Sequence, residues 1–312
     1  MRRIISLFVV TCTVIFFVSC EKEGVYHPSK KINKIITTYP DVYDSYGGIS
    51  KEVDLWTWGK KNLEKIDYYS NVSFDGSSYF TYDNHNRLAR ITYDGGSRAE
   101  YVYDGEHLKE ARCYMNGELS FAYTFSYTNG KITKIDVMEF YDYDLDDDDW
   151  KGIKLSSAGS HINVLQSLMN REMAQILNKT THKHLDKHTC KGEIEIYWYE
   201  LTWDKDNITK IVTKFDDYLG EIVAEAEYDK NNNPFYGSFW ECGITNDDVE
   251  DVLHSKNNCT KITITEREGD DYEEADVFTY SYSYEGKYPK SKQTICSMGG
   301  YYNMLEEYEY TK

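Results

Sequence analysis

The chain has 312 residues, with 35 basic and 53 acidic side chains and a formal net charge of −18. A surface this acidic repels nucleic acid and anionic lipid headgroups, so the composition argues against a nucleic-acid-binding protein. Hydrophobic residues make up 40% of the chain and 30 tyrosines add apolar area, so the chain can bury a core. The length allows one large domain or two ordinary ones.

The N-terminus has the three parts of an export signal. Two arginines form a basic start, an apolar run extends over residues 4–18, and the small residue Ser19 precedes Cys20. The run is shorter than the roughly 20 apolar residues that span a bilayer, so an uncleaved membrane helix is the less favoured interpretation. We predict a signal peptide over residues 1–19.

The site before Cys20 resembles the lipobox of bacterial lipoproteins, with Ser19 at the small position and Phe17 where Leu is usual. The resemblance implies that Cys20 is acylated, for example with palmitate, and that these lipid chains hold the protein on a membrane. We therefore expect an outer-membrane lipoprotein that faces the periplasm or the cell exterior, with residues 20–29 as a lipidated tether.

One motif recurs through the rest of the chain. It consists of an aromatic residue, a turn rich in Asp, Asn and Gly, an apolar residue, and an Ile three residues later; clear copies cover residues 56–66, 82–91, 127–135 and 201–211. The first apolar residue after each turn falls at positions 63, 88, 108, 132, 208 and 259. Most of these steps are close to 25 residues or a multiple of 25, which indicates an array of one supersecondary unit.

The repeated unit has the pattern of a β-hairpin. Large residues alternate before each turn, as Phe80 and Tyr82 do, which places them on one face of a strand. Two strands of about ten residues and a short turn account for the period. We predict an all-β fold, an antiparallel meander of repeated hairpins in a large curved sheet or barrel-like structure, forming a single domain over residues 30–312.

An insert at about residues 145–191 breaks this pattern. Four consecutive aspartates, 146–149, precede Ser160, which can cap a helix, and apolar residues then recur at helical spacing up to Leu177. We predict one inserted helix, packed across an open edge or mouth of the sheet. The alternative is a helix presented to a partner protein.

Five tryptophans on or beside predicted strands are the candidate ligand-binding residues. Exposed aromatic rings stack on sugars or on partner side chains, and the alternative is that they fill the face of a sheet short of Leu and Ile. The candidates are Trp56, Trp58, Trp198, Trp203 and Trp240.

Metal and cofactor signals are weak. His182, His184 and His188 are the candidate metal ligands, but lysines lie between them, and a basic solvated helix end is the favoured interpretation. No phosphate-binding loop, dinucleotide fingerprint or nucleophile motif is found, so we name no cofactor and no catalytic residue. Five of the seven cysteines follow Cys20, and we expect most of them to be small buried side chains rather than disulfides.

The repeats Phe80 to Leu88 and Tyr101 to Leu108 resemble YD repeats of the RHS type. Together with the segments 228–235, 255–262 and 278–289, they make the chain similar to uncharacterised Bacteroidetes lipoproteins described as having a porin-like fold. The resemblance implies a broad antiparallel β-fold or barrel and brings no activity or cofactor. The Asp-rich insert departs from it.

A lipid-facing pore is not expected from this resemblance. A barrel in a membrane needs one uninterrupted apolar face on each strand, whereas the return strands here carry charge on both faces, as Lys131 and Lys134 illustrate.

Three hypotheses for function remain open. The first is a non-catalytic envelope β-protein that binds a glycan or a protein through an aromatic sheet face. The second is a hydrolase of envelope or dietary glycans whose carboxylates come from separate hairpins. The third is a passive structural component that acts through assembly.

Overall fold

A computed structural model describes residues 24–39, 51–115, 117–140, 194–216, 220–237, 255–268, 271–272, 276–297 and 303–311. These residues form seventeen strands in one antiparallel sheet. The first nine are β1 (Ile32–Thr38), β2 (Lys51–Trp58), β3 (Leu63–Ser70), β4 (Ser73–Tyr82), β5 (Leu88–Tyr93), β6 (Arg98–Asp104), β7 (His107–Met115), β8 (Glu118–Thr128) and β9 (Lys131–Phe140). The others are β10 (Ile194–Asp204), β11 (Asn207–Phe215), β12 (Gly220–Asn232), β13 (Asn257–Glu268), β14 (Asp271–Tyr272), β15 (Asp276–Glu285), β16 (Tyr288–Cys296) and β17 (Met304–Tyr310).

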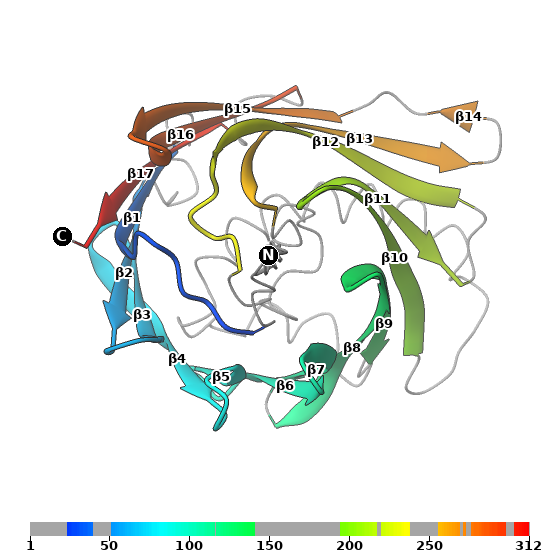
Figure 1. The fold of residues 1–312 in the computed structure, drawn as a ribbon, viewed down its shortest axis with the longest axis horizontal. Coiled ribbons are helices and arrows are strands. Elements are labelled where there is room, and N and C mark those ends of the chain that lie inside the picture. Colours follow the sequence, from blue (N-terminus) through cyan, green and yellow to red (C-terminus); the bar gives the residue numbers. More distant parts are fainter. Residues whose placement is uncertain are drawn as a thin grey trace, which may run out of the picture.

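The sheet closes on itself to form a barrel (Figure 1). Apart from β14, each strand pairs with the strands before and after it in sequence, and β1 pairs with both β2 and β17, so the first and last strands join. β14 has two residues and pairs only with the end of β13, so the ring itself has sixteen strands. The predicted all-β antiparallel, barrel-like fold is confirmed, and closure leaves no unpaired first or last strand in the ring that the described residues form.

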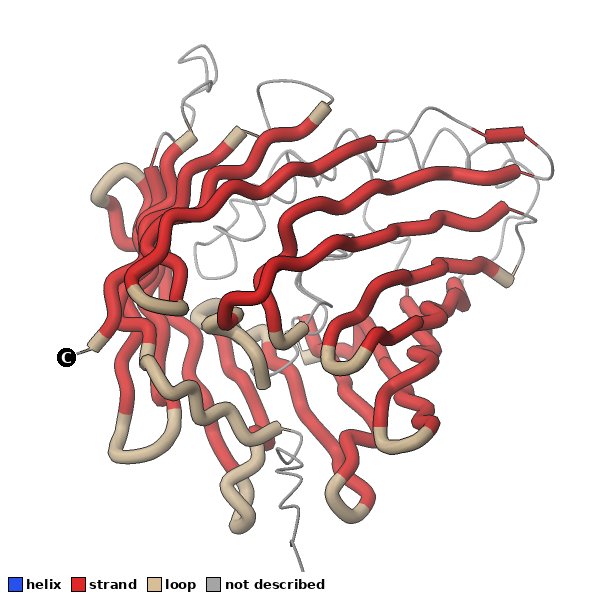
Figure 2. The backbone as a smooth tube through the Cα atoms, turned by 45° about the horizontal axis from the view of Figure 1, so that its top comes forward, coloured by secondary structure: helices blue, strands red, loops and turns tan. Residues whose placement is uncertain are grey.

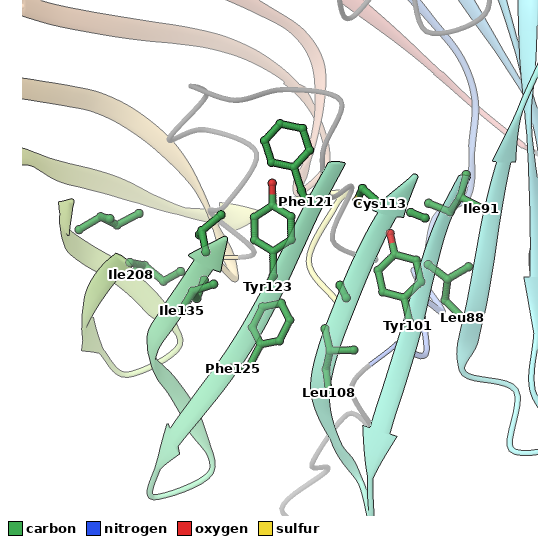
Figure 3. Packing of buried hydrophobic residues seen from close by; sticks show 14 of the residues in the cluster. Leu88, Ile91, Tyr101, Leu108, Cys113, Phe121, Tyr123, Phe125, Ile135 and Ile208 are labelled. Carbon is green, nitrogen blue, oxygen red and sulfur yellow. The ribbon is translucent and has the colours of Figure 1, made fainter. Parts of the chain in front are cut away.

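The apolar face of the barrel wall points inward. Residues 24–31 lie within the outline of the ring (Figure 1), and Tyr26 in this segment belongs to the same buried cluster as side chains from β3 to β16. Figure 3 shows part of this cluster along neighbouring strands, from Leu88 and Ile91 to Ile135 and Ile208. The core is therefore the inner wall and what packs against it.

The outer face carries the charged residues. Arg90 and Glu100 are paired in register next to the buried pair Ile91 and Ala99, so they face the opposite side of the sheet. Ion pairs on this outer face include Arg90–Glu100 at 3.0 Å, Lys214–Glu200 at 2.9 Å and Arg267–Glu221 at 3.4 Å. This distribution is the reverse of a lipid-facing barrel, which is apolar outside and polar inside.

A β-bulge in each repeat explains the sequence motif. Where β4 meets β5, Tyr82 pairs with Leu88 but Thr81 pairs with Arg90, so one residue is skipped. The extra residue lets Leu88 and Ile91 both point inward although they are three apart, and both are fully buried. The same shift occurs at the corresponding place in six other hairpins.

Eight aromatic side chains form hydrogen bonds between neighbouring strands that no turn connects at that end of the barrel. Each donates a hydrogen bond of 2.5–2.8 Å to a backbone carbonyl. The acceptor is the residue paired at the bulge of the preceding strand pair or, for Trp58, the first residue of β1. These aromatic–carbonyl bonds run from Trp58 to Ile32, Tyr82 to Leu63, Tyr103 to Leu88, Tyr127 to Leu108, Trp203 to Ile132, Tyr228 to Ile208, Tyr282 to Cys259 and Tyr310 to Pro289. The apolar positions of the repeat are thus the acceptors of a hydrogen-bonded belt around one end of the barrel.

The Asp that follows the aromatic residue closes the turn. The Asp83 carboxylate accepts hydrogen bonds from the backbone amides of His85 and Arg87, at 2.8 and 2.9 Å, and pairs with the Arg87 guanidinium. Asp229 accepts from the amide of Asn231 at 2.8 Å in the same manner. Asp83 thus caps a tight turn, and Asp229 caps the backbone near the end of β12. The tight turns of the repeat gather at one end of the barrel (Figure 2).

Residues 24–29, part of the range expected to be a tether, contact the barrel. Tyr26 is buried and its hydroxyl donates to the Pro234 carbonyl at 2.7 Å, and the Leu88 amide donates to the Gly24 carbonyl at 2.8 Å. Residues 20–23, together with the signal peptide and Cys20, lie outside the described residues. The predicted insert at 145–191 and its helix also lie outside them.

Among the residues that the structure describes, no helix is long and apolar enough to cross a membrane.

The aromatic–carbonyl bonds predict a stability effect. Replacing Tyr82 by Phe removes the donor to Leu63 and is expected to lower the free energy of unfolding by about 1 kcal/mol, because a buried carbonyl loses its partner. Urea denaturation measures this loss. The control is Tyr79→Phe on the outer face, where the side chain is 42% exposed; an equal loss in both variants would contradict a specific role for the Tyr82 hydroxyl.

The inward direction of the apolar face predicts a second contrast. Ile135→Ala is expected to cost about 2–5 kcal/mol of unfolding free energy, because Ile135 is fully buried in the inner cluster. Ile295→Ala, at a 48% exposed position of the outer face, is expected to change it by less than about 0.5 kcal/mol. The reverse order of the two losses, measured by the same denaturation, would show that the core faces outward.

Candidate functional site

Three of the five candidate tryptophans lie on the inner wall. Trp58 and Trp203 use their indole N–H groups in aromatic–carbonyl bonds, so part of their role is structural. Trp56 stacks on Trp58 with ring centroids 6.4 Å apart, contacts Phe235 at 6.2 Å, and has a buried indole N–H without a hydrogen-bond partner. The structure therefore brings Trp56 and Trp58 together on one part of the wall.

The remaining candidates are not part of this group. Trp198 is on the outer face, where its indole N–H donates to Glu200 at 3.2 Å and Lys134 lies 5.1 Å from its ring. Trp240 lies outside the described residues, as do His182, His184 and His188. The ligand-binding and metal-binding roles of all these residues stay predictions.

The described cysteines and acids form no metal centre. Cys113 and Cys296 are buried and Cys259 is half-buried. Within the described ranges, no group of three or more His, Cys, Asp and Glu side chains is arranged to hold a metal ion.

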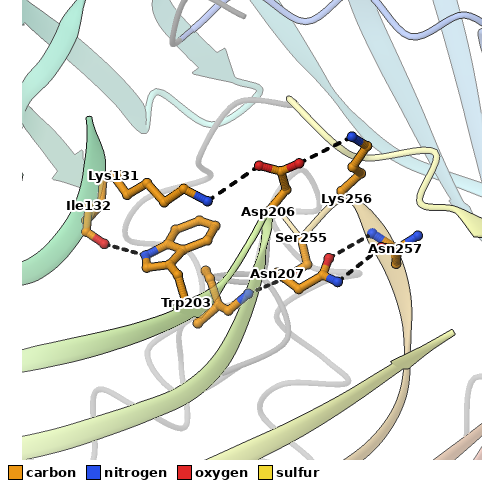
Figure 4. A network of polar contacts seen from close by, with 9 residues as sticks. Lys131, Ile132, Trp203, Asp206, Asn207, Ser255, Lys256 and Asn257 are labelled. Carbon is orange, nitrogen blue, oxygen red and sulfur yellow. Dashed lines mark hydrogen bonds and ion pairs between the residues drawn. The ribbon is translucent and has the colours of Figure 1, made fainter. Parts of the chain in front are cut away.

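A polar network occupies the end of the barrel where β10 turns into β11 and β13 begins (Figure 4). Asp206 lies between Lys131 at 3.4 Å and Lys256 at 3.2 Å. Asn207 and Asn257 exchange two hydrogen bonds of 3.1 Å, from the Asn207 side-chain amide and from the Asn257 backbone amide. The network ties strands that are about fifty residues apart in sequence.

The same network holds the segment after β12 inside the ring. The Asn233 amide donates to the Ser255 carbonyl at 2.9 Å, and the Asp229 carboxylate accepts from Asn258 and from the Tyr284 hydroxyl. Residues that carry the family resemblance, in segments 228–235 and 255–262, thus serve to fix a long connection. Because their polar groups satisfy one another, this network is a structural feature.

The last repeat departs from the motif at one position. The inward residue three places after the first apolar residue is apolar in the other bulged hairpins: Ile66, Ile91, Ala111, Ile135, Ile211 and Ile262. After Pro289 in β16, the corresponding residue is Lys292. A lysine therefore replaces a core isoleucine on the inner wall.

Lys292 forms a partly buried ion pair with the neighbouring strand. Its ammonium lies 2.9 Å from Glu306 Oε2 on β17, with side-chain exposures of 17% and 15%, and 4.9 Å from the ring of Tyr280 on β15. The Tyr308 hydroxyl donates to the other carboxylate oxygen of Glu306 at 3.1 Å. Burial, and then the charge of Glu306, hold the pKa of Tyr308 well above its ordinary value, so this hydroxyl stays a donor.

A second carboxylate lies on the same row of the wall. Thr37 on β1 pairs with Glu306 on one side and with Glu52 on the other, so the two acids flank β1 on one face. Glu52 is buried and accepts from the Tyr39 hydroxyl at 2.9 Å. Burial and the nearby Glu52 raise the pKa of Tyr39.

Two hydroxyl groups beside the ion pair have no hydrogen-bond partner. Tyr280 and Thr294 face each other across β15 and β16 and are 4% and 0% exposed. Their side-chain oxygens are buried and unpaired. We call Glu52, Tyr280, Lys292, Thr294 and Glu306 the inner polar site.

Sequence reasoning did not find this site. The sequence does contain an indication of this site, because Lys292 stands where most copies of the repeat have Ile. This indication is hard to recognise in the sequence, because Pro289 replaces the usual Leu or Ile after the turn and makes the last copy unlike the others.

Comparison with solved structures finds two porin-like proteins. The crystal structure of a porin-like protein from Bacteroides uniformis has a TM-score of 0.50 at 12% identity and covers 92% of this chain and 100% of its own. A porin-like protein from Bacteroides vulgatus has a TM-score of 0.46 at 9% identity, covering 90% and 99%. No protein-family model and no curated protein matches the sequence. The predicted porin-like fold is confirmed by the first likeness, which extends to the fold alone.

The polar network predicts a titration. Burial raises the pKa of Asp206, but hydrogen bonds and charges from Lys256 and Lys131 outweigh it, and the pKa is lowered overall. The pair therefore stabilises the fold above the ordinary Asp pKa, and this contribution is lost as the pH falls through the lowered value. Lys256→Met is expected to raise the pKa of Asp206, measured by carbon NMR of the carboxylates. The control Lys109→Met, on an exposed side chain, should leave it unchanged.

Proposed function

We propose that this protein is a non-catalytic, lipid-anchored barrel of the outer membrane that stands in water and binds a glycan against its inner wall. The observation that carries the proposal is the polarity of the two faces, with ion pairs outside and aromatic side chains inside. Charged side chains on a lipid-facing barrel wall cost about 2–4 kcal/mol each near the bilayer midplane. A ring of such pairs supports a barrel surrounded by water.

The anchor in this proposal is a lipid on Cys20, in the segment that resembles a lipobox. An integral barrel needs no lipid anchor, whereas a water-surrounded one needs it to stay at a membrane. The lipobox and the charged outer wall therefore support each other.

The glycan is supported by the chemistry of the inner wall. Tyrosine and tryptophan rings present flat apolar faces with a polar tip, the combination that stacks on sugar rings while bonding their hydroxyl groups. The stacked pair Trp56 and Trp58 and the inner polar site offer both elements.

The anchoring part predicts a partition experiment. The lipidated protein is expected in the detergent phase of a Triton X-114 separation, and Cys20→Ala is expected in the aqueous phase with an unchanged β-type circular dichroism spectrum. Neither protein should form conducting channels in a planar bilayer. A folded Cys20→Ala protein that still requires detergent, or that conducts ions, would contradict the proposal of a water-surrounded barrel.

A carboxylate-based hydrolase is the second candidate. Glu52 and Glu306 lie two strands apart on one face, which places their Cα atoms about 10 Å apart. Glycosidases use a pair of acids whose carboxyl groups are about 5–10 Å apart, a separation that side chains on two such Cα atoms can span. Release of reducing sugar by the wild type and its loss in both Glu52→Gln and Glu306→Gln would favour this candidate over simple binding.

A further inference from the structure

We infer that the inner polar site is the point of glycan contact and that it takes one neutral saccharide unit, with Lys292 as the residue that determines binding. This inference rests on the proposed glycan-binding function and assigns it to particular side chains. No sequence motif points to these residues; the departure from the repeat does.

Stability does not explain Lys292. A partly buried ion pair is generally no more stabilising than well-packed apolar residues of similar volume, and isoleucine fills the equivalent position in five other hairpins. Local rules that hold throughout a fold and fail at one place indicate function there. The lysine and its partner Glu306 both depart from the apolar inner wall, on adjacent strands.

The unpaired hydroxyl groups point to a polar ligand. Leaving a buried hydroxyl without a partner is unfavourable, and Tyr280 and Thr294 provide two of them next to Lys292. The Lys292 and Glu306 side chains are 17% and 15% exposed, although Glu306 Oε2 itself is buried, and the two hydroxyl residues beside them are almost fully buried. In this inference, a ligand hydroxyl group at the ion pair is the missing partner of these two groups.

The mixture of groups selects a neutral polyhydroxylated ligand. Lys292 donates hydrogen bonds, Glu306 and Glu52 accept them, and hydroxyl groups do both, which matches the hydroxyl groups of a sugar. A simple cation would have to compete with Lys292 for Glu306. An anion would meet the carboxylates of Glu52 and Glu306.

The test compares Lys292→Met with Lys290→Met, the same substitution two residues away on an exposed side chain. The probes are maltoheptaose, cellohexaose, xylohexaose, mannohexaose and chitohexaose, titrated calorimetrically into the full-length folded protein. Lys292→Met is expected to lower the affinity for the bound oligosaccharide by about tenfold or more, since hydrogen bonds from a charged group are lost. Lys290→Met is expected to bind as the wild type does.

A second variant distinguishes loss of binding from loss of folding. Thr294→Val removes only the hydroxyl group and is expected to weaken binding several-fold with an unchanged melting temperature. If the wild type binds an oligosaccharide and both Lys292→Met and Thr294→Val bind it equally well, the site assignment is wrong while the glycan-binding function stands. If the wild type binds none of the five probes, the glycan-binding proposal itself fails, and the assignment with it.

Discussion

The barrel depends on the hydrogen bonds that aromatic side chains donate to backbone carbonyls at one end of the wall. Each bond joins two strands that no tight turn connects at that end, so turns and aromatic–carbonyl bonds alternate around the ring. Trp58 to Ile32 and Tyr310 to Pro289 extend the series to the two strands at the chain ends. Burial raises the pKa of Tyr82 and Tyr228 above the ordinary tyrosine value, so these hydroxyls remain protonated donors at neutral and mildly alkaline pH.

The bulge beside each of these bonds determines which way the wall faces. Without the extra residue, an apolar residue and the Ile three positions later would lie on opposite faces of the strand. With it, both point inward and the basic residue between them, such as Arg90 or Lys210, points outward. One local irregularity, repeated in seven hairpins, thus produces a charged outer surface around an apolar inner one.

Much of this could be predicted from sequence because the deciding interactions are local. The spacing of the positions 63, 88, 108 and 132 reports hairpins whose turns and bulges lie within ten residues, and these positions are the carbonyl acceptors. Closure could not be predicted, since the pairing of Ile35 with Tyr308 joins residues far apart in sequence and leaves no local signature. The direction of the wall was also hidden, because charge occurs on both faces once the bulges are ignored.

The inner polar site lies at the seam where the barrel closes. Lys292 and Glu306 meet when β16 pairs with β17, and Glu52 joins them only because β1 pairs with both β17 and β2. Residues from both ends of the sequence therefore form one surface only in the completed ring, so the site cannot exist in a partly assembled meander. A protein that binds through such a site couples recognition to closure, because the ion pair and the acid beside it contribute little to stability by themselves.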